Sequence, residues 1–358
     1  MRIILIYGCM LISIYAVCQD PENILLKDYR PRSIYKVPVT TINKAKYQAI
    51  DAHSHDYAKT EQDVKSWIST MDQAGIGKSI ILSMATGQKF DSIYHKYSKY
   101  GGRFDIWCGI DFTNHQDKGW VERAIKELER CKKLGAKGVG ELIDKGMGFG
   151  YAGGKEPGIH IDDPRMKQIL ARCAALKLPV NVHVAEPLWM YEKMDSTNDG
   201  LMNAYSWKID LSRESILNHQ QLIQTLSNAV RDNPQTTFIA CHFANCEYNL
   251  EILGKLFDQY SNLYADIGAR FGETTPIPRY MLSFYKRYQD RLLYGTDMGT
   301  SLSMYKVTFR ILESNDEHFY ETDLFNYHWP CNGFGLPDEV LEKVYFKNMN
   351  KIISATSK

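Results

Sequence analysis

Short apolar runs alternate with longer amphipathic segments along the chain from Tyr47 onward. The apolar runs have the length of buried β-strands, and the segments between them repeat apolar positions at helical spacing. After Thr60, Asp63 stands where the second partner of a capping box belongs. The predicted strands are 47–52, 79–84, 104–110, 137–141, 179–184, 237–242, 263–267 and 291–295. The predicted helices begin after Thr60 and then cover 92–100, 120–134, 164–176, 215–231, 250–260, 277–288 and 304–312.

This alternation of strands and helices is typical of one fold class. It predicts a parallel sheet, and eight strand–helix units predict a closed (β/α)8 TIM barrel over residues 46–358 as a single domain. An open doubly wound sheet is the alternative, but no G-x-G-x-x-G motif follows the first strand. Residues 19–45 are polar, contain prolines and show no period. We therefore expect an N-terminal extension that lies on the surface of the domain.

The first 18 residues differ from the rest in composition. Arg2 is followed by an apolar run over residues 3–17, with small residues at Ala16 and Cys18. This pattern is typical of a secretory signal peptide. The run is shorter than the roughly 20 apolar residues of a membrane-spanning helix. We predict cleavage near Cys18 and export to the periplasm or the extracellular space without stable membrane insertion, with lipid anchoring at Cys18 as the alternative.

Charge and cysteine content change this picture little. The chain has 43 basic and 42 acidic residues, and a formal net charge of +1 does not predict binding to nucleic acid or to an anionic membrane. A small-molecule substrate is expected, and homo-oligomerisation is left open. The cysteines beyond residue 18 show no zinc-finger or C-x-x-C spacing. Cys108 and Cys241 lie in strand-like runs and are predicted to be buried apolar residues.

Polar side chains gather at the carboxyl ends of the predicted strands, where the chemistry of such barrels takes place. His53 and His55 stand two residues apart at the first strand end, so both imidazoles point to one face. Two imidazoles on one face make half of a divalent-metal site, although H-x-H alone fits a solvated turn equally well. Histidines at other strand ends favour the metal site. The polar strand-end residues are His53, His55, Asp111, Glu141, His183, His242, Asp266 and Asp297.

The segments that carry these residues resemble the metal-dependent amidohydrolase superfamily, and in particular its amidohydrolase-related (amidohydrolase 2) branch of TIM-barrel hydrolases. The matching segments are 51–55 (DAHSH), 138–142 (GVGEL), 181–183 (NVH), 241–243 (CHF), 294–297 (YGTD) and 346–350 (FKNMN). The sequence departs from the family pattern at Met298, because many relatives have a proline near this position. This departure leaves the shape of the last loop open and does not involve the ligands.

The resemblance implies a role for each of these polar residues. His53, His55 and His183 are expected to bind one divalent metal ion. Asp297 is expected to bind or approach the ion and to act as the base towards the attacking water, and His242 is expected to orient that water or the substrate oxygen. Glu141 stands where some relatives carry a ligand, which in some of them is shared between two ions.

Three protein ligands and an open position are typical of a catalytic metal site rather than a structural one. Imidazole and carboxylate ligands suit zinc, and manganese, iron or nickel would also fit. We favour one ion over two. A bridge between two ions would need a lysine or a second carboxylate at the fourth strand, and Glu141 stands there alone.

The leading hypothesis for the function is an exported metal-dependent hydrolase that attacks an ester, lactone or amide bond of a small molecule. A non-oxidative decarboxylase of the same branch is the main alternative, and a catalytically silent ligand-binding barrel is less favoured. Long loops over 142–162 and 185–214 are expected to form the substrate pocket. In it, Trp189 and Tyr191 would stack on the substrate or equally pack the loop onto the barrel. Arg270 would hold a substrate carboxylate or instead pair with Asp266.

Overall fold

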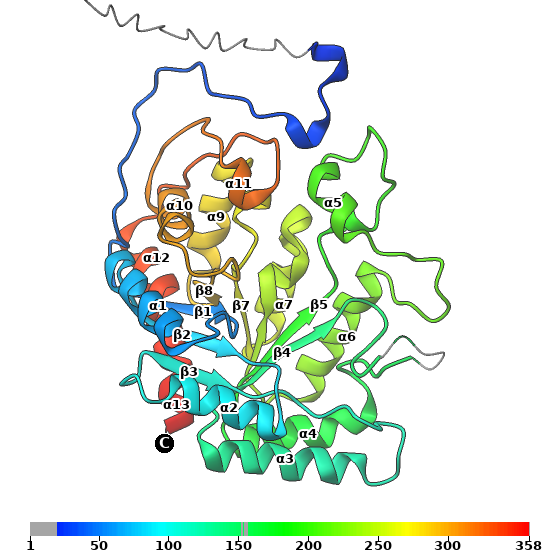
Figure 1. The fold of residues 1–358 in the computed structure, drawn as a ribbon. Helices are drawn as coiled ribbons and strands as arrows, with labels where there is room; N and C mark the ends of the chain where they lie inside the picture. Colours follow the sequence, from blue (N-terminus) through cyan, green and yellow to red (C-terminus); the bar gives the residue numbers. More distant parts are fainter. Residues whose placement is uncertain (1–19, 152, 154–156, 358) are drawn as a thin grey trace, which may run out of the picture.

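The computed structural model describes residues 20–151, 153 and 157–357, so the predicted signal peptide lies outside the described residues. All eight predicted strands are present and point into the centre of the molecule, with helices around them (Figure 1). The strands are β1 (Ala49–Ser54), β2 (Ile76–Leu82), β3 (Phe104–Trp107), β4 (Val139–Asp144), β5 (Val180–Val184), β6 (Phe238–Ala240), β7 (Leu263–Asp266) and β8 (Leu292–Leu293).

The strands are all parallel and follow one another around the molecule in chain order. Continuous pairing joins β1 to β3 through β2, and β4 to β8 through the strands between them. Hydrogen bonds also cross the two remaining seams. The backbone N–H of Cys108 donates to Gly138 O at 3.0 Å, and that of Ala52 donates to Tyr294 O at 2.8 Å. The TIM-barrel prediction is confirmed.

The helices follow the predicted order. Thr60 and Asp63 form the predicted capping box at the start of α1, and α3 has the predicted bounds. α2 begins earlier than predicted, at Gly87. The main helices are α1 (Glu61–Ala74), α2 (Gly87–Tyr97), α3 (Trp120–Leu134), α4 (Pro164–Ala175), α6 (His219–Asp232), α7 (Glu251–Gln259), α9 (Pro278–Tyr288) and α10 (Leu302–Glu313). Shorter or later helices are α5 (Leu201–Trp207), α8 (Phe271–Thr274), α11 (Thr322–Phe325), α12 (Asp338–Glu342) and α13 (Asn348–Ser357).

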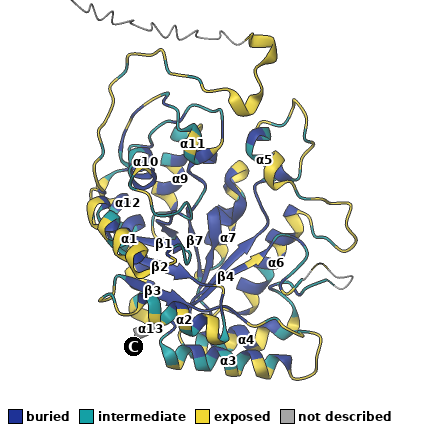
Figure 2. Ribbon diagram, in the orientation of Figure 1, coloured by how far each residue is buried: buried dark blue, intermediate teal, exposed yellow. Residues whose placement is uncertain are grey.

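The core has two parts, and the smaller one closes the bottom of the barrel. Figure 2 shows the strands mostly buried and the helices buried on the side that faces them. Inside the barrel, apolar side chains of the strands meet Met349 and Ile352 of α13. Because this end is filled with apolar side chains, a polar site can form only at the opposite end, where the strands terminate.

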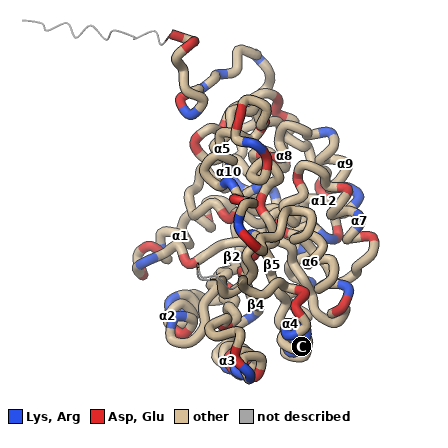
Figure 3. Tube along the Cα trace, turned by 90° about the vertical axis from the view of Figure 1, so that its right-hand side faces the viewer, with Lys and Arg blue, Asp and Glu red and all other residues tan. Residues whose placement is uncertain are grey.

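Residues 20–44 run over the outside of the barrel and are mostly exposed (Figure 1). This segment is tied to the barrel at Thr40, whose N–H and hydroxyl both donate to the carboxylate of Asp316. Basic and acidic residues are interspersed along the outer helices in Figure 3. Among the described residues, no helix is both long enough and apolar enough to span a membrane.

Candidate metal centre

β1 delivers two imidazoles to the carboxyl end of the barrel. His53 belongs to the strand and is fully buried, and His55 follows the strand and is partly exposed. Nδ1 of His53 lies 3.0 Å from Oδ2 of Asp266, and Nδ1 of His55 lies 2.9 Å from Leu82 O. A carbonyl or carboxylate oxygen only accepts, so Nδ1 of each ring carries the proton. The lone pair of each Nε2 therefore points into the site.

Two further imidazoles come from the ends of β5 and β6, and backbone carbonyls orient both. Nδ1 of His242 donates to Gly268 O at 2.8 Å, so its Nε2 faces the site. In His183 the roles are reversed, because Nε2 donates to Ala185 O at 2.8 Å and Nδ1 faces inwards. His242 lies beyond its strand, in the turn Cys241–Asn245, with a left-handed φ of 58°. Strained backbone of this kind is often found at functional sites.

Glu141 lies at the centre of these four rings. Its Oε1 is 2.8 Å from Nδ1 of His183, 3.5 Å from Nε2 of His242 and 3.7 Å from Nε2 of His53. Its Oε2 is 3.5 Å from Nε2 of His55. Sequence analysis placed this residue at a strand end, whereas in the structure it lies within β4. The strand continues past it to Asp144, which places the Glu141 carboxylate among the imidazoles.

Asp297 is the second carboxylate that faces the imidazoles, and it lies closer to solvent. Its Oδ1 is 3.1 Å from Nε2 of His55 and 3.8 Å from Nε2 of His53, and its Oδ2 is 3.7 Å from Nε2 of His242. The hydroxyl of Tyr57 donates to Oδ1 at 3.3 Å. The Asp297 side chain is 23% exposed, so it can meet a molecule that enters from solvent.

The donor set fits a divalent cation. Two ligands of a tetrahedral zinc ion lie roughly 3.4 Å apart. The distances between the inward imidazole nitrogens and the two carboxylates cluster around this value. Nε2 of His53 is buried and has no hydrogen-bond partner among the described residues, which is costly unless an ion accepts its lone pair. Two groups of residues could each hold an ion, because within each group the donor atoms all lie within 4.8 Å of one another. His53 belongs to both groups. The groups are His53, Glu141, Cys241 and His242, and His53, His55 and Asp297.

Cys241 is a member of the first group that sequence analysis treated only as a buried apolar residue. Its Sγ donates to Oδ1 of Asn181 at 2.8 Å. Burial, together with the nearby carboxylates of Glu141 and Asp266, holds the pKa of its thiol well above the ordinary value. The Cys241 side chain is therefore a protonated thiol that packs beneath the site.

The electrostatics of the site favour ionised carboxylates. Burial alone would raise the pKa of Asp297, but the His53 imidazole and the neighbouring rings outweigh burial and lower it. The pKa of Glu141 is also lowered, because His53 and His183 outweigh its burial. The pKa of Asp266, which lies behind His53, is lowered as well, because the interaction with His53 outweighs burial. Burial lowers the pKa of His53, but the carboxylates of Asp266, Asp297 and Glu141 outweigh it and raise that pKa well above its ordinary value, so the imidazolium and the carboxylates stabilise each other's charges. A divalent cation bound among these groups would take the place of the proton on the inward nitrogen.

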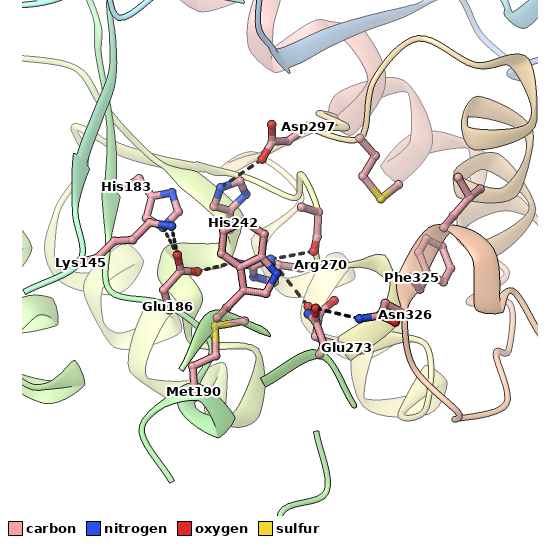
Figure 4. Close-up of a pocket in the computed structure, with 15 residues that line it drawn as sticks. Lys145, His183, Glu186, Met190, His242, Arg270, Glu273, Asp297, Phe325 and Asn326 are labelled. Carbon is pink, nitrogen blue, oxygen red and sulfur yellow. Dashed lines mark hydrogen bonds and ion pairs between the residues drawn. The ribbon is translucent and has the colours of Figure 1, made fainter. Parts of the chain in front are cut away.

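A cavity of about 330 Å³ opens beside these residues (Figure 4). His183, His242 and Asp297 form its inner end. The loop over 185–214 contributes to its wall as predicted, but among the described residues of the glycine-rich loop after β4 only Lys145 lines the cavity. The segment 324–326 also lines the cavity, and sequence analysis assigned no role to it. The remaining lining residues are Glu186, Met190, Asn203, Trp207, Ala269, Arg270, Glu273, Met298, Leu324, Phe325 and Asn326.

Of the three predicted substrate-binding residues, only Arg270 lines the cavity. Trp189 packs beside Trp329, with ring centroids 5.5 Å apart, and the Tyr191 hydroxyl accepts from the backbone N–H of Glu186. The predicted role of these two aromatic residues in stacking on the substrate remains a prediction. Trp207 and Phe325 are the aromatic residues that reach the cavity.

The predicted pairing of Arg270 with Asp266 is wrong. Asp266 is used by His53, and Arg270 lies among three other carboxylates, those of Glu186, Glu247 and Glu273. Sequence analysis missed these glutamates. Glu186 comes two residues after β5 ends, so the rule about polar residues at strand ends would have found it. Asp111, which that rule did select, is exposed and accepts from the N–H of Thr113.

Comparisons with known proteins agree with this geometry. A family model described as Amidohydrolase matches residues 112–350, more than half of the chain. The matched region contains Glu141, His183, His242 and Asp297 and begins after His53 and His55. No curated protein sequence matches the chain.

Solved structures with the same fold cover most of the chain. A putative amidohydrolase from Staphylococcus aureus is 16% identical, with a TM-score of 0.55 over 86% of this chain and 99% of that one. A dihydroxybenzoic acid decarboxylase from a Polaromonas species, with bound manganese, is 13% identical, with a TM-score of 0.53 over 86% and 97%. A 4-oxalomesaconate hydratase from Rhodopseudomonas palustris is 12% identical, with a TM-score of 0.53 over 86% and 96%. At these identities the likeness shows the fold alone. This chain belongs to the amidohydrolase family of metal-dependent TIM-barrel enzymes, because the family model matches most of it and the barrel and the donor set agree with that match.

Proposed function

We propose that this protein is a hydrolase that cleaves an ester, lactone or amide bond of a small molecule with the help of a divalent metal ion. The observation that carries the proposal is the position of Asp297, a carboxylate at the inner end of the cavity and beside the inward nitrogens of His55 and His242. A bound divalent ion would polarise the scissile carbonyl and lower the pKa of water towards neutrality. His53, His55 and His183 are the residues that would hold it, and Glu141 lies beside them.

The protein groups have distinct tasks in this reaction. Asp297 is ionised and partly exposed, so it can accept the proton that the attacking water loses and then pass it to the leaving group. His242 is buried, and its pKa is lowered by burial and by Arg270. Its neutral ring can therefore hold the water or the substrate oxygen in place without competing for the proton.

Two observations favour hydrolysis over non-oxidative decarboxylation, which is the alternative for this family. Decarboxylation does not need a proton acceptor beside a water molecule. It does need a substrate carboxylate, and both cations among the described lining residues, Lys145 and Arg270, already face carboxylates of the protein. The metal ion would then be the main partner for a substrate carboxylate.

A panel of lactones, esters, amides and aromatic acids tests the reaction class. We expect the metal-loaded protein to release acid from at least one lactone, ester or amide, measured by pH-stat titration, and to release no carbon dioxide. Asp290→Asn is the matched control for Asp297→Asn, because Asp290 is exposed, precedes β8 whereas Asp297 follows it, and lies outside the cavity lining. Carbon dioxide release from an aromatic acid without any acid release from the other compounds would establish the decarboxylase instead.

We propose zinc as the metal, bound as a single ion, because imidazole and carboxylate ligands suit it. Metal analysis of protein purified without added metal checks this proposal. Manganese or iron as the main bound metal would contradict it.

We also propose that the protein is exported, because residues 1–18 have the pattern of a signal peptide. Mass spectrometry of the native protein should then give an N-terminus near Gln19. A diacylated Cys18 would show lipid anchoring, and an intact Met1 would contradict export.

A further inference from the structure

The cavity contains two cations, and the protein pairs both of them. Lys145 Nζ forms an ion pair with Oε1 of Glu186. The buried guanidinium of Arg270 lies 3.7 Å from Oε2 of Glu186, 3.7 Å from Oε1 of Glu273 and 3.8 Å from Oε2 of Glu247. Figure 4 shows Arg270 between Glu186 and Glu273. In this part of the wall the carboxyl groups outnumber the cations.

Arg270 also donates hydrogen bonds to other groups of the protein. Nε and Nη2 both donate to Oδ1 of Asn245, at 2.9 and 2.5 Å, and Nη1 donates to Ala269 O at 2.7 Å. A substrate carboxylate is recognised best by two parallel N–H groups of one guanidinium. The hydrogen bonds that Arg270 donates use three of its five N–H groups, and the buried guanidinium also faces three carboxyl groups, so a substrate carboxylate would have to compete with them for Arg270. It therefore acts as a counter-ion within the wall.

The remaining lining groups suit hydroxyls and a ring. The carboxylates of Glu186 and Glu273 accept hydrogen bonds, and the amides of Asn203 and Asn326 both donate and accept. A substrate hydroxyl can satisfy such groups without adding charge. The planar side chains of Trp207 and Phe325 offer apolar faces on which the C–H groups of a ring can pack.

We propose that the cavity selects an uncharged, hydroxyl-bearing ring, of the chemical class of a sugar lactone, and discriminates against substrates with a carboxylate on that ring. This inference rests on the proposed hydrolase function and adds the substrate class to it. A carboxylate on the ring would lie near Glu186 and Glu273 and find no unpaired cation among the described lining residues. Specificity would then come from repulsion as much as from attraction.

Pairs of unreactive ligands that differ in one group test the selection by charge. Methyl glycosides of the gluco, galacto and manno series, each with its uronate, differ only in a hydroxymethyl or carboxylate group. We expect metal-loaded protein to bind at least one neutral glycoside about tenfold or more tightly than its uronate by isothermal titration calorimetry. Equal or tighter binding of the uronates, or no binding of any neutral glycoside, would overturn the inference.

Substitutions of glutamates in the cavity wall test whether their charge causes the preference for the neutral ligand. In Glu186→Gln, which leaves Lys145 unpaired, and in Glu273→Gln, the preference for the neutral ligand should fall several-fold. Glu317→Gln is the matched control, because Glu317 is exposed and outside the cavity lining. The ratio of the two affinities is the readout, so a general loss of affinity does not imitate the effect. An unchanged ratio in both wall variants would overturn the inference.

Hydrolysis of the corresponding neutral and carboxylate-bearing lactones, followed in parallel, separates this inference from the proposed function. Preferred hydrolysis of the carboxylate-bearing lactones would overturn the substrate class and leave the hydrolase standing. Selective binding of neutral glycosides, with no acid release from any lactone, ester or amide, would contradict the hydrolase and support the selection by charge.

Discussion

Nδ1 of His53 lies 3.0 Å from Oδ2 of Asp266, and both side chains are fully buried. This contact fixes the tautomer of the imidazole and points its Nε2 at Glu141 and Asp297. A carboxylate in this position also makes the ring a stronger ligand. The backbone N–H groups of His242 and Gly268 donate to the other oxygen of Asp266, so the same carboxylate holds three elements of the site together.

Asp266→Asn should weaken metal binding by about 10- to 100-fold, because the amide cannot polarise the His53 ring as a carboxylate does. Competition with a chromophoric chelator measures the affinity directly. Unfolding in denaturant serves as the control, since the variant must first be shown to fold. An unchanged metal affinity in a folded variant would show that His53 is not oriented by this contact.

His53→Ala and His183→Ala should each lose metal and activity together, because each removes one of few ligands. His95→Ala is the matched control, because His95 is an exposed histidine of α2. Metal content per chain, measured by elemental analysis after dialysis, is the readout. Full occupancy in both site variants would refute the ligand assignment.

Asp297→Asn should lower turnover by about 10²- to 10⁴-fold, the range for loss of a general base, while much of the metal is retained. The asparagine keeps the shape of the side chain but cannot accept the proton. Turnover and metal content are measured on the same sample. Loss of metal in proportion to activity would make Asp297 chiefly a ligand.

Glu141→Gln decides between one ion and two. The two oxygens of Glu141 face different imidazoles, so the residue lies where a bridging ligand would. With one ion, the metal content should be near one per chain in the unsubstituted protein and should not fall by a whole ion in the variant. A content near two that falls to one in Glu141→Gln would refute the single-ion proposal.

Glu247 should make stability depend on pH. Burial raises its pKa from the ordinary 4.5 to about 8, although Arg270 acts in the opposite direction. Between these values the folded chain holds a proton that the unfolded chain has lost, so stability falls as pH rises from 4.5 towards 8. Glu247→Gln should remove this part of the slope in denaturant titrations from pH 5 to 9. The exposed Glu251→Gln should keep the slope, and an identical slope in both variants would contradict the assignment.

The order of elements and the barrel could be predicted from the sequence, because strand burial and helix amphipathicity are local patterns with their own periods. Strand ends were harder to predict. Glu141 lies within β4 rather than at its end, and β6 stops before the turn that carries His242. These limits depend on pairing with neighbouring strands, which the local pattern does not contain.

By itself, the sequence determined most of the polar residues that meet at the mouth of the barrel, because parallel strands all end on the same side, although it missed Glu186 and selected Asp111. Only the tertiary structure decided how these residues are used. The acceptor for Nδ1 of His53 lies 213 residues away in the chain, and the counter-ions of Arg270 include Glu186, from the end of another strand. The orientation of an imidazole and the charge of a cavity depend on such distant partners, and these come together only when the barrel closes.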